Sequence, residues 1–193
     1  AIDFHKWLYQ PFEGGCTLVR NWENLRKTYY KKAAYLDTEL ANDGGRLEFN
    51  EHYFQLSRNA KAFKVWLSIK AYGMKRLKDM IQKDIDLTNY LNEQVEAAED
   101  FELVADSKLA VSCFRYVGKM TDKEEIVAFN HRLMPALEKD GRVFIMGTKL
   151  KGDYAIRACL INHRKSKKTI DFLLDVIRDV AQKVEVKMAK HEY

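Results

Sequence analysis

The sequence lacks an apolar run long enough to cross a bilayer, and its first residues lack the pattern of a secretory signal peptide. Cysteine is scarce as well, with three residues at Cys16, Cys113 and Cys159. An odd number of cysteines without metal-ligand spacing is typical of free thiols and argues against a disulfide framework or a zinc site. We therefore expect buried thiols in a reducing compartment, the cytoplasm, with neither a membrane nor a metal as partner.

A strong excess of one charge is also missing. Lysine and arginine total 33 residues against 28 aspartates and glutamates, and the surplus is spread along the chain. Proteins that bind nucleic acid usually gather positive charge in one stripe, so we expect no nucleic-acid partner. The most basic run, residues 163–168, precedes a predicted helix and contains no aromatic residue. We interpret this run as a solvated loop.

One lysine has unusual neighbours. The chain opens Ala-Ile-Asp-Phe-His-Lys-Trp, which places Lys6 between bulky aromatic residues. A lysine in apolar surroundings loses hydration, so its pKa falls and its neutral amine can attack a carbonyl group. A lysine that forms a Schiff base, including one that holds pyridoxal phosphate, needs this property. The alternative is a lysine whose stem packs past Phe4 and Trp7 while its amine stays in water.

The chain does not begin with methionine, and Lys6 lies very close to its first residue. A functional element so near a free end would fray unless something held it. We therefore expect this chain to be the later part of a larger protein.

The first part of the chain predicts short elements and one helix. Residues 16–20 have strand composition after Gly14-Gly15, and Asn21 is placed to cap a short helix that begins at Trp22. Residues 31–50 show little apolar repeat and predict a mobile surface loop. A helix is predicted from about residue 60 to residue 72, where Gly73 is placed to end it. Its wide apolar face comprises Phe63, Trp66, Leu67 and Ile69.

The second part predicts a β-β-α-β-β-α order after a long helix. The predicted strands are 101–105, 109–116, 142–150 and 154–162, and the predicted helices are 74–98, 121–139 and 169–189. Thr121-Asp122-Lys123-Glu124 predicts a capping box, and Pro135 a kink. The last helix directs Ile170, Leu174, Ile177, Ala181, Val184 and Met188 inward. This order predicts an antiparallel sheet with helices on one face, an α+β arrangement.

Several short motifs follow one another along the first part of the chain. They are Asp3-Phe4-His5-Lys6-Trp7, Pro11-Phe12-Glu13-Gly14-Gly15-Cys16, Ala34-Tyr35-Leu36, and Leu56-Ser57-Arg58 with Lys64-Val65-Trp66. In this order and spacing they resemble segments of the group II pyridoxal-phosphate-dependent amino-acid decarboxylases, which include aromatic-L-amino-acid, histidine and glutamate decarboxylases. The resemblance covers the whole chain, and the chain is well under half the length of a family member.

The resemblance implies a fold class that mixes α/β and α+β, the C-terminal part of a fold type I enzyme. Residues 1–73 would be the remainder of the large cofactor-binding domain, and residues 74–193 the small antiparallel-sheet domain with helices on one face. It also implies a homodimer with shared active sites. The groups that bind the cofactor ring and most of its phosphate would lie in an upstream portion of the same enzyme.

The family's functional residues fall on defined positions of this sequence. Lys6 would form the internal aldimine with pyridoxal 5'-phosphate. His5, also a candidate catalytic residue, and Asp3 would lie near the cofactor phosphate, although the family often has Asn where Asp3 stands. Tyr35, on a mobile loop, would protonate the quinonoid carbon after carbon dioxide leaves. Ser57 would lie at a neighbouring subunit's active site. There it would contact the cofactor and shape the substrate pocket. Phe12 would likewise reach this pocket across the dimer.

The residue types suit this chemistry. A tyrosine with a pKa near ~10 keeps its proton at pH 7 and can donate it. We therefore predict decarboxylation of a small-molecule L-amino acid to the amine and carbon dioxide. Two alternatives stay open: an oxidative deaminase or aldehyde synthase of the same fold, and a non-catalytic fragment or interaction module. Tyr35 favours decarboxylation, because oxidising relatives often lack this tyrosine. Read without the resemblance, Tyr35 could be an ordinary loop residue and Ser57 a helix N-cap.

Overall fold

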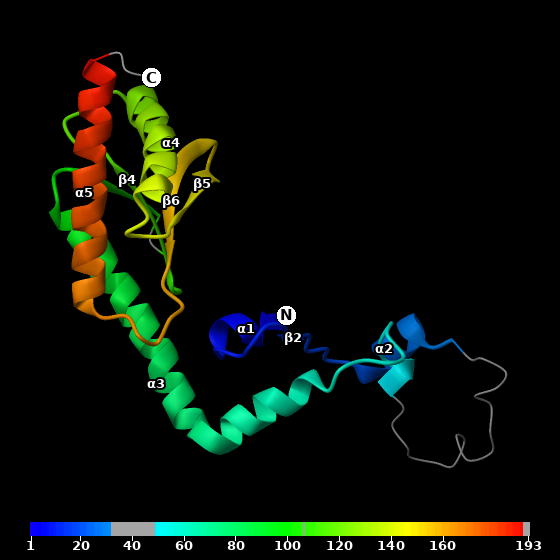
Figure 1. Cartoon of the computed structure of the whole chain (residues 1–193). Coiled ribbons are helices and arrows are strands. Elements are labelled where there is room, and N and C mark those ends of the chain that lie inside the picture. The colour runs from blue at the N-terminus through cyan, green and yellow to red at the C-terminus, as the bar shows by residue number, and fades with distance from the viewer. Residues whose placement is uncertain (32–48, 106, 191–193) are drawn as a thin grey trace, which may run out of the picture. The chain divides into compact units, whose positions relative to one another are not determined.

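The computed structural model describes residues 1–31, 49–105 and 107–190, which belong to two compact units (Figure 1). The first unit is Ala1–Gly73 and the second is Met74–Tyr193. The assignment of residues 1–73 to a large cofactor-binding domain, and of residues 74–193 to a small domain, stays a prediction. Among the described residues, no helix is long and apolar enough to cross a membrane.

The second unit is built on a four-stranded antiparallel sheet. Its strands are β3 (Phe101–Ala105), β4 (Val111–Tyr116), β5 (Met146–Leu150) and β6 (Asp153–Cys159), in the spatial order β3-β4-β6-β5. Strands β5 and β6 form a tight hairpin in which Leu150 pairs with Asp153. The two residues between them, Lys151 and Gly152, have φ values of 51° and 93°. Two positive φ values suit the type I′ turn, whose twist matches that of the paired strands.

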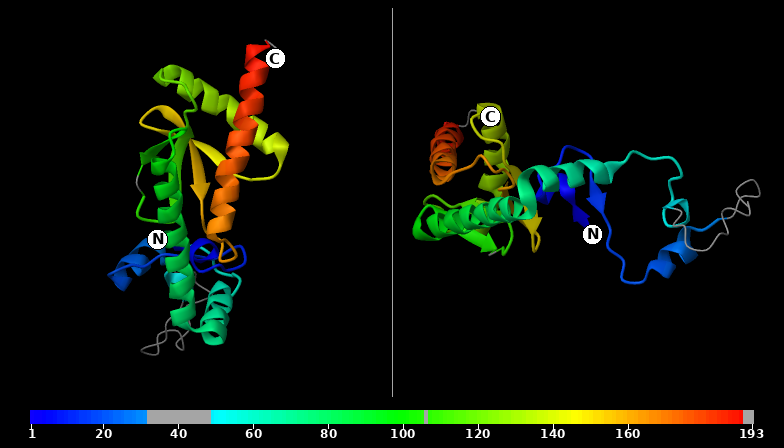
Figure 2. Two further views of the ribbon diagram at one scale, coloured as in Figure 1. Left: turned by 90° about the vertical axis from the view of Figure 1, so that its left-hand side faces the viewer. Right: turned by 90° about the horizontal axis from the view of Figure 1, so that it is seen from below.

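Three helices cover one face of this sheet (Figure 2). They are the later part of α3 (Lys61–Ala97), α4 (Lys123–Asp140) and α5 (Lys167–Ala189). Side chains alternate along a strand, so Ser112 and Tyr116 of the central strand β4 share a face. The Ser112 hydroxyl donates to Asn92 of α3 at 2.7 Å. The Tyr116 ring packs on Phe129 of α4, and its hydroxyl donates to Glu185 of α5 at 3.5 Å.

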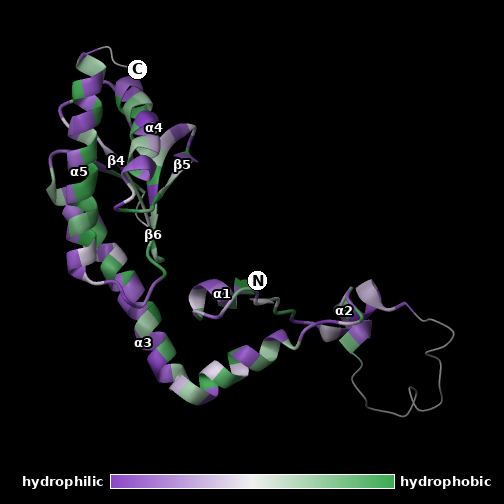
Figure 3. Cartoon of the chain, in the orientation of Figure 1, coloured by the Kyte–Doolittle hydropathy of each residue, from purple (hydrophilic) through white to green (hydrophobic). Residues whose placement is uncertain are grey.

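The apolar core of the second unit lies between the sheet and these helices. Its least exposed large side chains, each with less than 2% of its surface accessible, include Leu91, Val95, Phe114, Leu133, Leu137, Ile156 and Ile177. Figure 3 shows hydrophobic residues recurring along α4 and α5. The predicted inward residues of the last helix are buried from Ile170 to Val184, whereas Met188 is half-buried. The β-β-α-β-β-α prediction is confirmed.

The start of α4 differs from the prediction. The helix begins at Lys123, with Asp122 as its N-cap; the Asp122 carboxylate accepts a hydrogen bond from the Glu125 amide at 2.8 Å. The capping box predicted at Thr121 is therefore wrong by one residue, because aspartate caps a helix at least as well as threonine. The helix continues through Pro135 without a break and ends at Gly141, whose φ is 78°.

The first unit contains short elements and one long helical segment. Strand β1 (Ile2–Asp3) precedes helix α1 (Phe4–Trp7) and pairs with β2 (Gly15–Cys16); α2 (Trp22–Tyr29) and the 3-10 turn η3 (Phe49–Glu51) follow. The strand predicted over 16–20 is wrong beyond Cys16, because only Ile2–Asp3 pairs with it among the described residues. Asn21 caps α2 as predicted and accepts a hydrogen bond from the Glu23 amide at 3.1 Å.

Helix α3 is interrupted at Gly73, whose φ of 78° and ψ of 152° are not helical. Glycine adopts a positive φ at little cost, so the predicted end of the first helical segment is confirmed. The apolar face predicted on that segment is largely exposed. Phe63 is 58% exposed, Trp66 54% and Leu67 45%. This segment contacts the rest of the first unit through a different face of the helix, which carries Lys61, Lys64 and Ser68.

Candidate functional site

Lys6 lies in the segment of residues 4–14, the Lys6 loop, which the pairing of β1 with β2 closes. The β1–β2 ladder pairs Ile2 with Cys16 and Asp3 with Gly15, which joins the two ends of the segment between them. Helix α1 starts directly after β1, and the Leu8 amide donates to the Phe4 carbonyl at 3.2 Å. The ladder places Lys6 one helical turn after a fixed strand residue.

The amine of Lys6 is bound to a carboxylate from that strand. Lys6 Nζ donates to Asp3 Oδ2 at 2.5 Å, and the two side chains are 59% and 42% exposed. This hydrogen bond, followed by the positive charge of Lys6, lowers the pKa of Asp3 from its ordinary value. The prediction of apolar surroundings for Lys6 is wrong for the described residues. Phe4 and Trp7 precede and follow it in sequence, but the short helix turns the lysine toward Asp3.

His5 is fixed against the far end of the same loop. Its Nδ1 lies 2.9 Å from the Gly14 carbonyl oxygen, to which it donates when it carries the proton. The backbone amide of His5 also donates to that carbonyl, at 3.2 Å. The edge of the His5 ring meets the Phe12 ring, with centroids 5.0 Å apart and planes at 65°. The structure thus brings Asp3, His5 and Lys6 together and adds Phe12 of the same chain; the predicted reach of Phe12 across the dimer stays a prediction.

Ser57 and Arg58 lie outside this group in the described structure. Ser57 is exposed and precedes α3, which begins at Lys61, so Ser57 does not cap that helix. The Arg58 guanidinium lies over the rings of Tyr53, at 4.7 Å from the centroid, and of Phe49, at 5.8 Å. A cation held on two aromatic faces has a structural role here.

Tyr35 lies outside the described residues. The elements on either side of residues 32–48, α2 and η3, contact each other. The Trp22 ring stacks on His52 with centroids 4.6 Å apart, and Arg26 Nε donates to Glu51 Oε2 at 2.8 Å. His52 is buried, with 8% of its surface exposed. Sequence reasoning missed this contact, because no period or motif relates the two positions.

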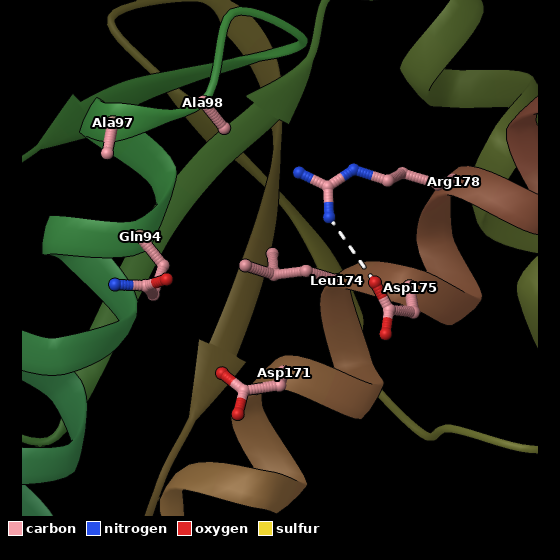
Figure 4. A pocket seen from close by; sticks show the side chains of 7 residues that line it. All are labelled: Gln94, Ala97, Ala98, Asp171, Leu174, Asp175 and Arg178. Carbon is pink, nitrogen blue, oxygen red and sulfur yellow. Dashed lines mark hydrogen bonds and ion pairs between the residues drawn. The ribbon is translucent and has the colours of Figure 1, made fainter.

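The second unit contains an open hollow of about 450 Å³ between α3 and α5 (Figure 4). Gln94, Asp171, Asp175 and Arg178 supply its polar lining, and Arg178 donates to Asp175 at 3.4 Å. None of the predicted site residues lines this hollow. Within residues 1–31, 49–105 and 107–190, no three His, Cys, Asp or Glu side chains gather as metal ligands would.

The cysteines are unpaired, but only one is buried. Cys113 on β4 is buried, and that burial raises the pKa of its thiol. Cys16 is half-buried and Cys159 is exposed, so the prediction of three buried thiols is wrong for these two. Cys16 and Cys159 are the last residues of strands β2 and β6.

Comparison with protein families settles the family of the chain. Residues 1–117 match the model of the pyridoxal-dependent decarboxylase conserved domain. The chain belongs to the pyridoxal-dependent decarboxylase family. The resemblance seen in the sequence is confirmed, and the matched range includes the Asp3–Lys6 turn and the first unit as a whole.

Individual members of the family are similar to nearly the whole chain. An aromatic-L-amino-acid decarboxylase of Bacillus atrophaeus is 31% identical over 187 residues, which cover 96% of this chain and 39% of the relative. Tryptophan decarboxylase 2 of Oryza sativa subsp. japonica is 24% identical, covering 97% of this chain and 38% of the relative. Phenylacetaldehyde synthase of Petunia hybrida is 24% identical over 94% of this chain and 37% of the relative. The chain therefore spans about two fifths of the length of these relatives.

Solved structures of the family share the fold. The crystal structure of Oryza sativa TDC with PLP and tryptamine superposes with a TM-score of 0.77 at 20% identity, covering 86% of this chain and 35% of that chain. Mouse CSAD superposes with a TM-score of 0.68 at 22% identity, over 81% of this chain and 34% of that one. The predicted fold class, helices with an antiparallel sheet as in the C-terminal portion of a fold type I enzyme, is confirmed.

Proposed function

We propose that the protein binds pyridoxal phosphate through Lys6 and decarboxylates an aromatic L-amino acid to the amine and carbon dioxide. The observation that carries this proposal is the place of the Lys6 amine, exposed on a closed turn within the region that matches the family. The choice of an aromatic substrate rests on the 31% identity with an aromatic-L-amino-acid decarboxylase.

The residues on this turn fit the cofactor unequally. Lys6 offers a primary amine that is 59% exposed and can reach an aldehyde. His5 is held beside it by Gly14. Asp3 already binds the Lys6 amine, and its negative charge would repel a phosphate. We therefore assign Asp3 to the amine. Its place near the cofactor phosphate stays a prediction, as does the contact of Ser57 with the cofactor.

Each residue then has a defined task. Pyridoxal phosphate, when bound, supplies an electron sink for the bonding electrons of the departing carboxylate. Lys6 would hold the cofactor through its amine, which would first have to separate from Asp3 and lose a proton. His5, whose ring has the Phe12 ring against it, is the residue next to Lys6 in sequence. Tyr35 donates the phenolic proton to the substrate α-carbon.

The cofactor assignment is tested by trapping. The full-length protein is mixed with pyridoxal phosphate, reduced with borohydride and digested, and the modified peptide is located by mass spectrometry. We expect the label on Lys6 and its loss in Lys6→Ala. A label on another lysine, or an unchanged label in Lys6→Ala, would contradict the assignment.

The substrate pocket is tested separately with Ser57→Gly and Phe12→Ala. Each variant is assayed with a panel of amino acids and should change the preferred substrate.

An aldehyde synthase is the second candidate, because the chain is similar to the phenylacetaldehyde synthase of Petunia hybrida. The structure of Rhodiola rosea 4-hydroxyphenylacetaldehyde synthase also superposes, with a TM-score of 0.65 and 26% identity. Product analysis separates the candidates: amine with carbon dioxide, or, with dioxygen as the oxidant, aldehyde with carbon dioxide, ammonia and hydrogen peroxide. Tyr35→Phe should suppress the amine. A protein that forms neither product and binds no cofactor would be the interaction module.

We further propose a cytoplasmic homodimer that also includes the upstream portion of the enzyme. The absence of disulfides among Cys16, Cys113 and Cys159 supports a reducing compartment. The exposed apolar side chains of the first segment of α3 support burial in an assembly. Light scattering of the full-length protein measures its mass, and a monomeric mass would contradict the homodimer.

A further inference from the structure

The first segment of α3 contacts the Lys6 loop through one narrow edge. Lys61, Lys64 and Ser68 are spaced three and four residues apart, so they share one face of the helix. Lys61 Nζ pairs with Glu13 Oε1 at 2.6 Å, Lys64 Nζ donates to the Pro11 carbonyl at 2.9 Å, and Ser68 donates to Gln10 Oε1 at 3.0 Å. Three side chains from the first two turns of the helix thus hold the segment that follows α1.

Gln10 connects this edge to the helix that carries Lys6. It is 7% exposed, and its backbone amide donates to the Phe4 carbonyl at 3.1 Å. Its side-chain amide donates to the Leu8 carbonyl at 2.8 Å, while its carbonyl oxygen accepts from Ser68. Gln10 therefore binds the two ends of α1 and, at the same time, Ser68 of α3.

Lys64 acts on the other side of the loop. Its ammonium lies on the Pro11 carbonyl, one residue before Phe12, whose ring meets His5. Its stem runs over Gly14: a Cβ placed on Gly14 would be 3.8 Å from Lys64 Cε. Gly14 in turn binds the His5 ring. Lys64 thus binds the residue before Phe12 and passes near Gly14, whose carbonyl oxygen contacts the His5 ring.

We propose that Lys64 and Ser68 are positioning residues for the cofactor lysine. They fix residues 10–14, and through them the orientation of His5 and Lys6, without contact with the reacting atoms. Lys61 contributes less to this positioning, because its partner Glu13 is 53% exposed and exposed ion pairs add little stabilising free energy. This inference rests on the proposed function of Lys6.

The test compares two lysines of the same helix in the full-length protein. Lys64→Met removes the donor and keeps the apolar stem, and Lys64→Arg keeps a donor. Lys70→Met is the matched control, because the Lys70 ammonium lies 6.0 Å from the centroid of the Trp66 ring and, among the described residues, forms no hydrogen bond or ion pair with residues 4–14. The apparent Kd for pyridoxal phosphate is measured by absorbance titration. We expect it to be about tenfold higher in Lys64→Met, restored in Lys64→Arg and unchanged in Lys70→Met.

A second readout needs no cofactor. Hydrogen exchange of the amides of residues 4–14 should become faster in Lys64→Met and in Ser68→Ala, with the thermal midpoint close to that of Lys70→Met. Exchange and cofactor affinity equal to those of Lys70→Met would overturn the positioning role. Faster exchange in a protein that never labels Lys6 would instead refute the proposed function, with the loop contacts intact.

Discussion

Asp3 Oδ2 accepts a hydrogen bond from Lys6 Nζ one helical turn further along the chain, at 2.5 Å. The proposed cofactor lysine therefore has a negatively charged partner on the strand that precedes it. The pair is exposed on both sides, so solvent screens it and its strength is modest. The amine has to leave this carboxylate before it can attack an aldehyde.

The first prediction follows from that pair. Asp3→Asn should speed the reaction of Lys6 with pyridoxal phosphate at neutral pH by roughly two- to fivefold, because a neutral amide holds the ammonium less strongly. Stopped-flow absorbance measures the rate. Glu13→Gln is the control, since it removes a carboxylate of the same loop that pairs with Lys61. Equal rates in the two variants would show that Asp3 does not restrain Lys6.

The second prediction concerns the contact between α2 and η3. Stacking of Trp22 on His52 should give a coupling free energy of about 0.5–1.5 kcal/mol in a double-mutant cycle of Trp22→Ala and His52→Ala. The cycle is measured by urea unfolding. Arg26→Met should change stability less, because the Arg26 side chain is 46% exposed.

Tyr35 lies between α2 and η3 in sequence, so His52→Ala should also slow amine formation. An unchanged rate would contradict a link between the Trp22–His52 contact and Tyr35.

The third prediction concerns Asn130, a fully buried amide on α4. It accepts a hydrogen bond from the Tyr116 amide at 3.0 Å and donates to the Tyr116 carbonyl at 2.7 Å. Asn130→Ala leaves both backbone groups of a buried strand residue unpaired and should cost about 2–4 kcal/mol of unfolding free energy. Denaturant unfolding measures the loss. Asn89→Ala, at an exposed position of α3, should cost far less, and equal losses would contradict the role of Asn130.

The fourth prediction concerns alkaline pH. Burial, followed by the negative charges of Glu185 and Asp100, raises the pKa of Tyr116 to about 12. An unfolded tyrosine titrates near ~10, so the folded state binds this proton more tightly. The resulting stability is fully present below about pH 10 and is lost as the pH rises toward and through about 12. Tyr116→Phe should show a shallower decline of stability over this range, and an identical decline would contradict the assignment.

Much of the second unit could be predicted from the sequence. The spacing of Leu91, Val95, Ile170 and Ile177 has the helical period because these side chains face a core within the chain. The first segment of α3 shows the limit of such reasoning. Phe63 and Trp66 have the same kind of spacing, yet they are exposed. Periodicity indicates an apolar face but not the surface that covers it.

The sequence names candidate site residues but does not indicate their geometry. The motif around Lys6 marked the lysine, whereas its ion pair with Asp3 depends on the tight start of α1 after β1. The edge formed by Lys64 and Ser68 was hidden among other polar residues of the helix. Its partners are a backbone carbonyl and a side-chain amide far away in sequence, which no local pattern indicates.

The exposed apolar face of the first segment of α3 has a practical consequence for protein production. Phe63, Trp66 and Leu67 would meet water if residues 1–73 were expressed by themselves, and such a polypeptide should be recovered in inclusion bodies or bound to chaperones. Residues 74–190, with their enclosed core, should instead remain soluble and elute as a single symmetric peak in gel filtration. Expression of the two pieces side by side would show this difference in a single fractionation.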